Sequence, residues 1–383
     1  MRVLHVIEAM HQGGAESLVI EHVRNAAPGV ESFVAALGRG GPALEEAQRA
    51  GAHTAVLRRA GRPAAPERIA ALSRLAGTLR RERIDVVNAH NPTGGLYAAA
   101  AARLAGCAVV IRTEHSIHYP GRHSPLYPWL ERWATRHSAA VICVCDAVRA
   151  SHGPRLAALS GRFVTIANGI GPAPAIRPRE EVRRALGLEP GALLVLTVGS
   201  LTSQKAQSVL IDAFAAVRRE RPAARLAIAG EGALCDALEH RARAAGVADA
   251  VWLLGARADV ADLMGAADVF ALSSIREGLS ITLLESMRAG LPAIVTAIGG
   301  NGEAVEDGVT GRVVPAGDAA ALAAALRALL DDPATRASFG QAARARWCAR
   351  FTAERMVRET EALYRRVLES AAPAAAAGAG AAR

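Results

Sequence analysis

Short apolar runs alternate along nearly the whole chain with longer segments whose apolar residues recur every three or four positions. A run of four to eight apolar residues is typical of a strand buried on both faces, and the longer spacing is typical of an amphipathic helix. The first part of the chain predicts strands at Val3–Ile7, Phe33–Leu37, Ala55–Leu57, Ile84–Ala89, Ala108–Thr113, Ala140–Val144 and Phe163–Ala167, and helices at Ala15–Ala26, Glu67–Arg81, Gly95–Leu104 and Leu126–Arg136. This alternation indicates a mainly parallel, doubly wound α/β sheet.

A second alternating series begins after a segment rich in glycine and proline, Asn168–Pro178, which has the composition of a linker. The series predicts strands at Leu193–Val198, Arg225–Ala229, Val251–Leu254, Val269–Leu272, Ala293–Thr296 and Arg312–Val314, and helices at Gln204–Arg219, Leu234–Ala244, Val260–Met264, Ile281–Met287 and Ala319–Leu329. From about Asp331 to Glu369 the pattern is helical throughout. The sequence therefore predicts two Rossmann-like domains.

The predicted boundaries follow from these changes of pattern. The first domain takes residues 1–170, a linker takes 171–178, and the second domain takes 179–348. A further helix spans 349–370. The last residues, 371–383, are almost entirely Ala and Gly, and this low complexity predicts disorder.

Composition narrows the class of protein. The chain is 51% hydrophobic, and no apolar run approaches the ~20 residues that a membrane-spanning helix needs. The first residues have too short an apolar stretch for a signal peptide, so we expect a cytoplasmic protein. The five cysteines are scattered, which argues against a disulfide framework. Cys143 and Cys145 fall on one face of a strand, where buried thiols are expected rather than metal ligands.

The formal net charge of +9 favours anionic partners such as nucleotides, acidic lipid surfaces or nucleic acid. Basic residues cluster at Arg58, Arg59, Arg62, Arg68, Arg74, Arg80, Arg81 and Arg83. This cluster is either a solvated face or a surface that docks peripherally on the inner face of an anionic membrane. Nucleic acid is not favoured, because aromatic residues do not alternate with the charges and no nucleic-acid motif is present.

The most informative stretch is Ser274–Met287, which links the predicted strand ending at Leu272 to a predicted helix. Glu277 and Gly278 lie on the strand-to-helix loop, and Glu285 is expected about two turns into the helix. The unpaired N–H groups and positive dipole of a helix N-terminus suit a pyrophosphate. Carboxylates are poor ligands for phosphate but good acceptors for sugar hydroxyls. The combination predicts a pocket for a nucleotide sugar.

Other candidate site residues also follow predicted strands. Gly13 and Gly14 stand between the first strand and helix, where glycine permits close approach of an anion. Lys205 follows the first strand of the second domain, and a compact ammonium suits a phosphate. His90 and His115 close two strands of the first domain.

Two other site classes find little support in the sequence. His115, His118 and His123 lack the carboxylate pattern or spacing of a metal site. The turn Gly230–Gly232 nearly matches the dinucleotide fingerprint, but Cys235 stands where a small residue should allow close packing. NAD is therefore disfavoured.

In its motifs the chain resembles the retaining glycosyltransferases of the GT-B fold, in particular glycosyltransferase family 4 (glycosyl transferases group 1). The resemblance covers nearly the whole chain up to Arg350. It implies that Glu277 is a catalytic residue that approaches the hydroxyls of the transferred sugar and that Glu285 binds the ribose. It assigns the donor phosphates to Gly14, Lys205 and the backbone at Gly278 and Leu279, and places His115 beside the sugar as a catalytic residue, with Gly13 and His90 as weaker candidates.

The sequence departs from the family pattern in places. Ser200 stands where the family commonly has Arg, Ala206 replaces the usual Gly, and Gly171 departs in the linker. One of two cations for the donor diphosphate is thus missing, and Arg257 or Arg276 is the candidate to replace it.

The resemblance implies a GT-B fold, with two Rossmann-like domains facing across a cleft and C-terminal helices crossing back to the first domain. It implies a retaining hexosyltransferase that needs no metal or other cofactor. A nucleotide sugar, UDP-linked by family frequency, would be the donor, and a glycan or lipid-linked molecule the acceptor, in cell-surface polysaccharide or glycolipid biosynthesis. Two alternatives stay open: a GT-B nucleotide-sugar epimerase, and a non-catalytic partner of a glycan-assembly complex.

Overall fold

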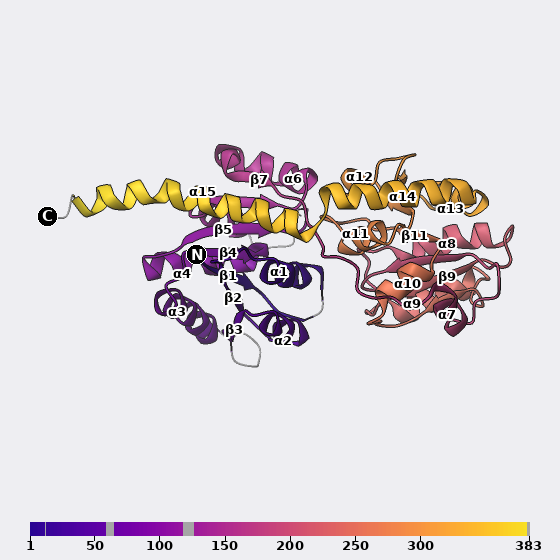
Figure 1. The fold of residues 1–383 in the computed structure, drawn as a ribbon, viewed down its shortest axis with the longest axis horizontal. Helices are drawn as coiled ribbons and strands as arrows, with labels where there is room; N and C mark the ends of the chain where they lie inside the picture. Colours follow the sequence, from indigo (N-terminus) through magenta and orange to yellow (C-terminus); the bar gives the residue numbers. More distant parts are fainter. Residues whose placement is uncertain (12, 59–64, 118–125, 381–383) are drawn as a thin grey trace. The chain divides into compact units, whose positions relative to one another are not determined.

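The computed structural model describes residues 1–11, 13–58, 65–117 and 126–380. The chain forms two compact units (Figure 1). The first, the N-terminal unit, comprises Met1–Gly169 together with Ala353–Arg383. The second, the C-terminal unit, comprises Ile170–Thr352. The last helix is therefore part of the N-terminal unit, as the family resemblance implied.

The N-terminal unit is built on a parallel sheet in the order β3-β2-β1-β4-β5-β6-β7. The strands are β1 (Arg2–Ile7), β2 (Glu31–Ala36), β3 (His53–Val56), β4 (Val86–His90), β5 (Val109–Glu114), β6 (Ala140–Cys143) and β7 (Phe163–Thr165). The order reverses between β1 and β4. In an open parallel sheet, ligands bind outside the carboxyl ends of the strands at such a switch point.

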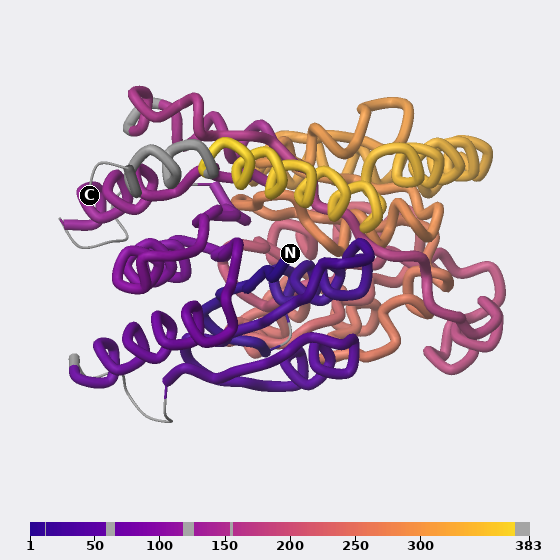
Figure 2. The backbone as a smooth tube through the Cα atoms, turned by 60° about the vertical axis from the view of Figure 1, so that its left-hand side comes forward, coloured from indigo at the N-terminus to yellow at the C-terminus, as the bar shows by residue number. Residues whose placement is uncertain are grey.

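The helices of this unit are α1 (Gly14–Arg24), α2 (Pro42–Arg49), α3 (Ala65–Arg81), α4 (Asn91–Ala105), α5 (Tyr127–Arg136), α6 (Asp146–Leu156) and α15 (Ala353–Gly380), with a 3₁₀ turn η1 (Ala157–Arg162). Helix α15, yellow in Figures 1 and 2, lies along the unit and contacts α1 and β5. Buried polar contacts hold it there. Asn88 Nδ2 donates to the Tyr364 hydroxyl at 2.7 Å, and the Ala27 N–H donates to Glu361 Oε1 at 3.0 Å.

The C-terminal unit has a second parallel sheet, in the order β10-β9-β8-β11-β12-β13. Its strands are β8 (Leu194–Val198), β9 (Arg225–Ala229), β10 (Val251–Leu253), β11 (Val269–Leu272), β12 (Ala293–Thr296) and β13 (Gly311–Val314). Its helices are α7 (Arg179–Ala185), α8 (Gln207–Arg218), α9 (Cys235–Ala244), α10 (Val260–Ala266), α11 (Ile281–Arg288), α12 (Asn301–Ala304), α13 (Ala319–Asp331) and α14 (Pro333–Arg350). Here the switch point lies between β8 and β11.

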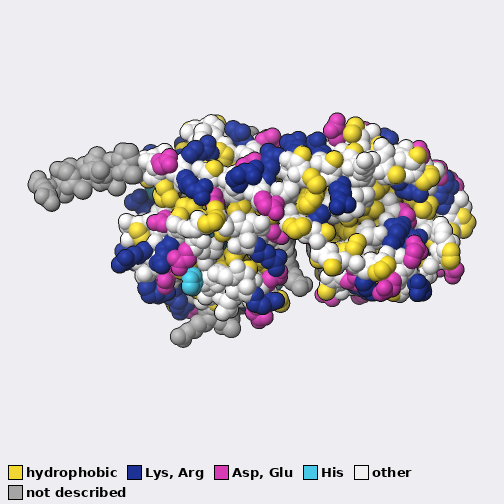
Figure 3. Space-filling model, viewed as in Figure 1, with side chains coloured by type: hydrophobic (Ala, Val, Ile, Leu, Met, Phe, Trp, Pro, Cys, Tyr) yellow, Lys and Arg dark blue, Asp and Glu magenta, His cyan; other side chains and the backbone are white. Residues whose placement is uncertain are grey.

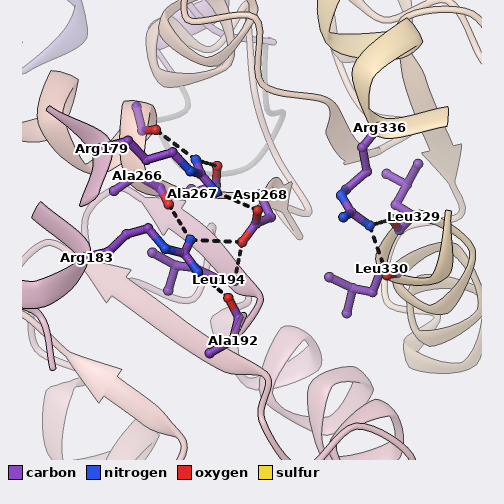
Figure 4. A network of polar contacts seen from close by, with 11 residues as sticks. Arg179, Arg183, Ala192, Leu194, Ala266, Ala267, Asp268, Leu329, Leu330 and Arg336 are labelled. Atoms are coloured by element: carbon purple, nitrogen blue, oxygen red, sulfur yellow. Dashed lines mark hydrogen bonds and ion pairs between the residues drawn. The ribbon is translucent and has the colours of Figure 1, made fainter. Parts of the chain in front are cut away.

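Helix α7 is clamped to the amino ends of these two strands (Figure 4). Arg183 donates to the carbonyls of Ala192 and Ala266, and its guanidinium lies 3.2 Å from Asp268 Oδ2. The same carboxylate oxygen accepts the Leu194 N–H at 2.7 Å. Charge-assisted bonds of this kind are stronger than neutral ones, so they fix the two strands that carry the candidate site residues.

The elements agree with the predicted series, and the differences have local causes. Helices α2, α7 and α12, of eight residues or fewer, were not predicted, and neither was α6, which has eleven. The predicted continuous helix after Asp331 is divided, because the Asp332 carboxylate caps the start of α14 by accepting the N–H groups of Ala334 and Thr335. The predicted helix is divided a second time before α15. Here the Phe351 carbonyl accepts the Ile170 N–H at 3.0 Å, and Ile170 and Thr352 form an isolated parallel β-bridge.

Helix α15 continues to Gly380, into the segment for which low complexity predicts disorder. Alanine, which dominates that segment, has the highest intrinsic helix propensity. Among the described residues, no helix is long and apolar enough to cross a bilayer.

Candidate active site

Lys205 and Glu277 meet at the switch point of the second sheet. Lys205 follows β8 and Glu277 follows β11, and these strands are hydrogen-bonded neighbours. Lys205 Nζ lies 2.6 Å from Glu277 Oε1. The Ser274 hydroxyl donates to the same oxygen at 2.7 Å. Oε2 of Glu277 receives no hydrogen bond from the residues that the structure describes, and it is therefore open to a hydroxyl donor.

Backbone contacts hold the Lys205 loop in place. The Ser273 hydroxyl donates to the carbonyls of Lys205 and Ala206 at 3.0 and 3.1 Å. The Lys205 stem passes over Gly199, where a Cβ would lie 3.3 Å from Cε. The chain at Gly199 also lies against Gly230, where a Cβ would come within 2.0 Å of the Gly199 carbonyl oxygen. The Gly230–Gly232 turn thus serves close packing of two loops, a role that needs no dinucleotide.

The loop before α11 is equally close-packed. Gly299 has a φ of +56°, and a Cβ there would lie 2.4 Å from the Glu277 carbonyl oxygen. The Gly300 N–H donates to the Gly278 carbonyl at 2.6 Å. Leu279 is buried, and α11 starts at Ile281. These contacts point the start of α11 at the carboxyl edge of the sheet, where its free N–H groups and positive dipole favour an anion.

Glu285 is the fifth residue of α11, just over one turn from its start rather than the predicted two. Burial raises the pKa of its carboxyl above the usual 4.5, and the nearby Arg288 charge opposes that shift. No hydrogen bond or ion pair to the Glu285 side chain occurs within the described part of the chain. A partly buried carboxylate without a donor is an uncompensated acceptor, which a ligand hydroxyl can satisfy.

The candidates for the missing second cation differ in their surroundings. Nε and Nη2 of Arg257 donate to the two carboxylate oxygens of Asp259, at 2.7 and 2.6 Å, so the charge of Arg257 is already offset. Hydrogen bonding from Arg257 lowers the pKa of Asp259. Arg276 adjoins Glu277, and its carbonyl accepts Gln204 Nε2 at 3.0 Å. Ser200 is exposed.

In the N-terminal unit, the exposed Gly13 and Gly14 form the start of α1. Gly13 has an extended backbone, and the Ser17 hydroxyl donates to its carbonyl at 2.9 Å. The Glu16 carboxylate lies over Gly13, where a Cβ would come within 2.4 Å of Oε2. Burial raises the pKa of Glu16.

His90 and His115 belong to a row of four imidazoles at the switch point of the first sheet. His5 stacks on His90 and His90 on His115, and the His22 ring is tilted against that of His5. His5 Nδ1 lies 3.1 Å from His90 Nε2, and His90 Nδ1 lies 2.9 Å from His115 Nε2. The His22 ring centroid lies 5.2 Å from that of His5. Burial lowers the pKa of His5 and of His115 to about 4. The row is therefore neutral at neutral pH.

The last atom of this row is Nδ1 of His115, which is buried and has no hydrogen-bond partner among the described residues. In a neutral row each imidazole donates once and accepts once, so this atom presents either a proton or a lone pair according to the tautomers of its neighbours. His115 can thus bond a hydroxyl in either sense.

Sequence reasoning missed several residues of these clusters. Ser274, Ser273, His5 and His22 were not predicted as site residues, although Ser273 and Ser274 directly follow a predicted strand and His5 lies within one. The sequence also held an unused signal: Lys205 is the only lysine in a chain with 45 Lys and Arg residues.

His118 and His123, two of the histidines considered as metal ligands, lie outside the described residues. Within those residues, no group of His, Cys, Asp and Glu is placed to hold a metal.

Two parallel Rossmann-like units, with charged and polar side chains at the switch point of each, define the GT-B class of glycosyltransferases. The chain belongs to glycosyltransferase family 4. The family model "Glycosyltransferase Family 4" matches residues 12–173, and the model "Glycosyl transferases group 1" matches residues 178–346. These two matches correspond to the sheets of the N-terminal and the C-terminal unit.

Proteins similar in sequence to this chain are also glycosyltransferases by name. The chain is 31% identical over 316 residues to the Bacillus subtilis (strain 168) protein EpsD, a glycosyltransferase by name, covering 79% of this chain and 82% of that one. It is 28% identical over 264 residues to the Escherichia coli UDP-Gal:alpha-D-GlcNAc-diphosphoundecaprenol alpha-1,3-galactosyltransferase, covering 66% and 68% of the two chains.

Solved structures share the fold. Anabaena HepE in complex with UDP-glucose superposes with a TM-score of 0.82 at 21% identity, covering 94% of this chain and 99% of that chain. The lipopolysaccharide-biosynthesis glycosyltransferase WaaG superposes with a TM-score of 0.74 at 19% identity, covering 94% and 98%. The expected GT-B fold is confirmed.

Proposed function

We propose that the protein transfers a hexose from a UDP-sugar to a glycan or lipid-linked acceptor, with retention of anomeric configuration, in cell-surface polysaccharide or glycolipid biosynthesis. The observation that carries this proposal is the Lys205–Glu277 pair, 2.6 Å apart at the switch point beside the start of α11. The pair places an ammonium group that can bind phosphate next to a carboxylate that can accept hydrogen bonds from sugar hydroxyls. The E. coli relative, a galactosyltransferase that uses UDP-Gal and a diphosphoundecaprenol-linked acceptor, supports the choice of donor and acceptor.

The difficult step is the departure of the nucleoside diphosphate as the bond between the anomeric carbon and the phosphate oxygen breaks. An ammonium has three N–H donors, so Lys205 can keep one on Glu277 and direct the others at the diphosphate. The N–H groups at the start of α11 face the same charge. Pre-placed donors of this kind are worth roughly 2.7–4 kcal/mol each at a developing charge.

Glu277 and Glu285 take the hydroxyls of the donor. With Oε1 of Glu277 held by Lys205 and Ser274, Oε2 is the atom left to orient the transferred sugar. Glu285, one turn further along α11, receives the ribose hydroxyls. We assign the neutral His115 of the N-terminal unit to a hydroxyl of the transferred sugar, through its unpartnered Nδ1.

Lipid-linked acceptors lie in membranes, so we place the activity in the cytoplasm, at the inner face of the membrane. No metal is assigned, because Lys205 and the start of α11 supply positive charge for the diphosphate. The net charge of +9 is consistent with such a location.

Thermal-shift titration with UDP, GDP, ADP and their sugars tests the donor site. A ligand at ~100 times its dissociation constant adds about 2.7 kcal/mol of stability. We expect UDP to stabilise the wild type but not Glu285→Ala, while Glu239→Ala, which removes an exposed acid of the same unit, behaves as the wild type. A protein that no nucleotide stabilises would favour the non-catalytic partner.

Transfer itself is then assayed with the stabilising UDP-sugar and a diphosphoundecaprenol-linked acceptor. NMR of the product gives its anomeric configuration, and an inverted anomer would contradict retention. Conversion of the donor to its epimer without acceptor would identify the epimerase instead.

A further inference from the structure

Helix α5 exposes a row of large apolar side chains that we name the α5 stripe: Leu126, Trp129, Leu130 and Trp133. Trp129 is 75% exposed and Leu126 66%, and the other two are also exposed. The spacing of three and four residues places them on one side of the helix. The other side carries Tyr127, Glu131, Ala134 and Thr135, which are buried in the unit. The helix therefore has an apolar face that the described residues leave exposed.

The charges around the α5 stripe are positive. Arg132 and Arg136 are exposed on α5 and make no hydrogen bond or ion pair with the described part of the chain. The acid of this helix, Glu131, is buried, with its Oε1 3.2 Å from His152 Nδ1. Helix α4, which packs on α5, ends with the exposed Arg103 and Leu104. Arginine and apolar side chains thus lie together, without an exposed acid on α5.

The arginine cluster noted in the sequence is only partly engaged: Arg68 and Arg83 are exposed and make no side-chain bond with described residues, Arg59 and Arg62 lie outside the described residues, and the other four are bonded within the unit. Arg58 donates to the Leu37 carbonyl at 2.8 Å, and Arg74 and Arg80 donate to the carbonyls of Leu57 and Ala105. Arg81 pairs with Glu82 at 2.7 Å. On the face shown in Figure 3, Lys and Arg side chains lie among Asp and Glu side chains rather than in one unbroken field. Net charge alone therefore does not mark a docking surface.

We propose that the α5 stripe docks the protein on an anionic membrane, with Trp129 and Trp133 at the level of the headgroups and Arg132 and Arg136 against lipid phosphates. Indole rings favour this boundary because one part is apolar and the N–H is polar. A helix with an apolar face beside arginines lies in the plane of the interface. At ten residues α5 is too short to span the membrane.

This inference deepens the proposed location by naming the surface responsible, and it rests on the proposed function only for the role of the membrane. Helix α5 belongs to the same unit as His115 and follows it in the chain. Docking through α5 would keep the N-terminal unit, the expected acceptor domain, at the surface that holds a lipid-linked acceptor.

Co-sedimentation of the full-length protein with vesicles tests the proposal. The vesicles are phosphatidylcholine alone, or phosphatidylcholine with 30 mol% phosphatidylglycerol. We expect binding to the anionic vesicles, with a blue shift of tryptophan emission. Trp129→Ala/Trp133→Ala should weaken partitioning tenfold or more, and Arg132→Glu/Arg136→Glu should lower it by a similar factor of about ten while reducing the further loss that added salt causes.

Matched control variants show whether vesicle binding depends on the α5 stripe itself or on exposed apolar side chains and net charge in general. Ile69→Ala/Val309→Ala removes exposed apolar side chains elsewhere, and Arg219→Glu/Arg344→Glu makes the same change of net charge on the C-terminal unit. Both should bind as the wild type. Equal loss in these controls, or no binding by the wild type, overturns the proposal.

UDP thermal shifts run in parallel distinguish the two proposals. The α5 variants should keep the UDP response of the wild type, which also shows that they are folded. If light scattering shows a dimer that the tryptophan variant converts to a monomer, the α5 stripe is an interface between copies, and the membrane proposal is wrong.

Discussion

Lys205 and Glu277 are separated by 72 positions in the chain, yet Lys205 Nζ lies 2.6 Å from Glu277 Oε1. The two residues follow neighbouring strands, β8 and β11, at the point where the strand order of the sheet reverses. Both side chains are mostly buried. A buried charged side chain is costly without a partner, and in this pair each side chain has the other as its partner.

Replacing Lys205 should abolish most transfer activity. Lys205→Ala removes an ammonium aimed at the leaving diphosphate, so we expect kcat/KM to fall by about 10²–10³. Lys205→Arg should not restore it, because the planar guanidinium is larger and cannot occupy the space over Gly199. Steady-state kinetics with the UDP-sugar measures both variants. An active Lys205→Arg enzyme would contradict the need for a compact cation.

Because the chain has a single lysine, this residue can also be addressed chemically. A lysine-selective acylating reagent should inactivate the enzyme, and UDP should protect it. Peptide mapping separates modification of Lys205 from that of the N-terminal amine. Inactivation that tracks the N-terminal amine alone would remove Lys205 from the site.

UDP affinity should fall in mildly acidic solution because of Glu285. Burial raises the pKa of this carboxyl above 4.5, so it takes up a proton at a higher pH than a solvated Glu. Only the ionised form accepts two ribose hydroxyls. As pH falls from neutrality through the raised pKa, we expect weaker UDP binding by calorimetry. Glu285→Gln should bind weakly at neutral pH and show a flatter pH profile; an unchanged profile would assign the titration elsewhere.

Chelation should leave the activity intact. If Lys205 and the start of α11 neutralise the diphosphate, transfer in EDTA should match transfer in Mg²⁺ within about twofold, whereas losing one donor at the diphosphate would cost ~10². Initial rates after exhaustive dialysis against EDTA provide the measurement. A large loss that Mg²⁺ or Mn²⁺ restores would show that the positive charge in the protein is insufficient.

The fold and the C-terminal cluster could be predicted from local pattern, and the N-terminal cluster largely could not. Strands β4 and β8 are short apolar runs, and Lys205 and Glu277 follow strands, so their approach is a consequence of parallel topology. The row of four histidines depends on the lateral order of β1, β4 and β5 and on the packing of α1. No spacing in the sequence relates His22 to His115. The hydrogen bond from Ser274 to Glu277 could not be predicted either, because it depends on how the side chains of one loop are oriented.

The α5 stripe likewise could not be predicted from the sequence pattern. Leu126–Arg136 was predicted as a helix, but periodicity cannot tell which of two apolar faces meets the core. Only burial in the folded unit shows that Trp129 lies outside and Tyr127 inside.

Acid should destabilise the N-terminal unit through the histidine row. An unfolded histidine takes up a proton near pH 6.5, whereas His5 in the folded unit does so near pH 4. Between these values the unfolded state binds more protons, so the free energy of unfolding falls as pH falls. We expect His5→Leu to lose less stability than the wild type between pH 7 and pH 5, by about 2 kcal/mol.

Hydrogen exchange of β1 and β4 at both pH values reports this unit separately. His53→Leu, which replaces an exposed histidine of the same unit, should keep the wild-type pH dependence. If the stability of the wild type and of His5→Leu changed equally with pH, the histidine row would not be the cause of the pH dependence.

Removing the Tyr364 hydroxyl should loosen the attachment of α15. This hydroxyl accepts the Asn88 Nδ2 proton at 2.7 Å in a buried environment, and Asn88 Oδ1 in turn accepts the Thr113 hydroxyl at 2.7 Å. Tyr364→Phe keeps the ring but leaves a buried donor unsatisfied, which costs about 1–3 kcal/mol.

Because α15 packs on α1 and β5, the loss should spread to the elements that carry Gly14 and precede His115. We therefore expect faster hydrogen exchange in α15, α1 and β5, and unchanged exchange in β8 and β11 of the other unit. Tyr97→Phe, in which the altered hydroxyl makes no bond with described residues, is the matched control. If Tyr364→Phe affects only α15, the helix is an appendage. If α1 and β5 respond with it, α15 is a structural part of the N-terminal unit, and truncation before Ala353 should also destabilise β5, which precedes His115.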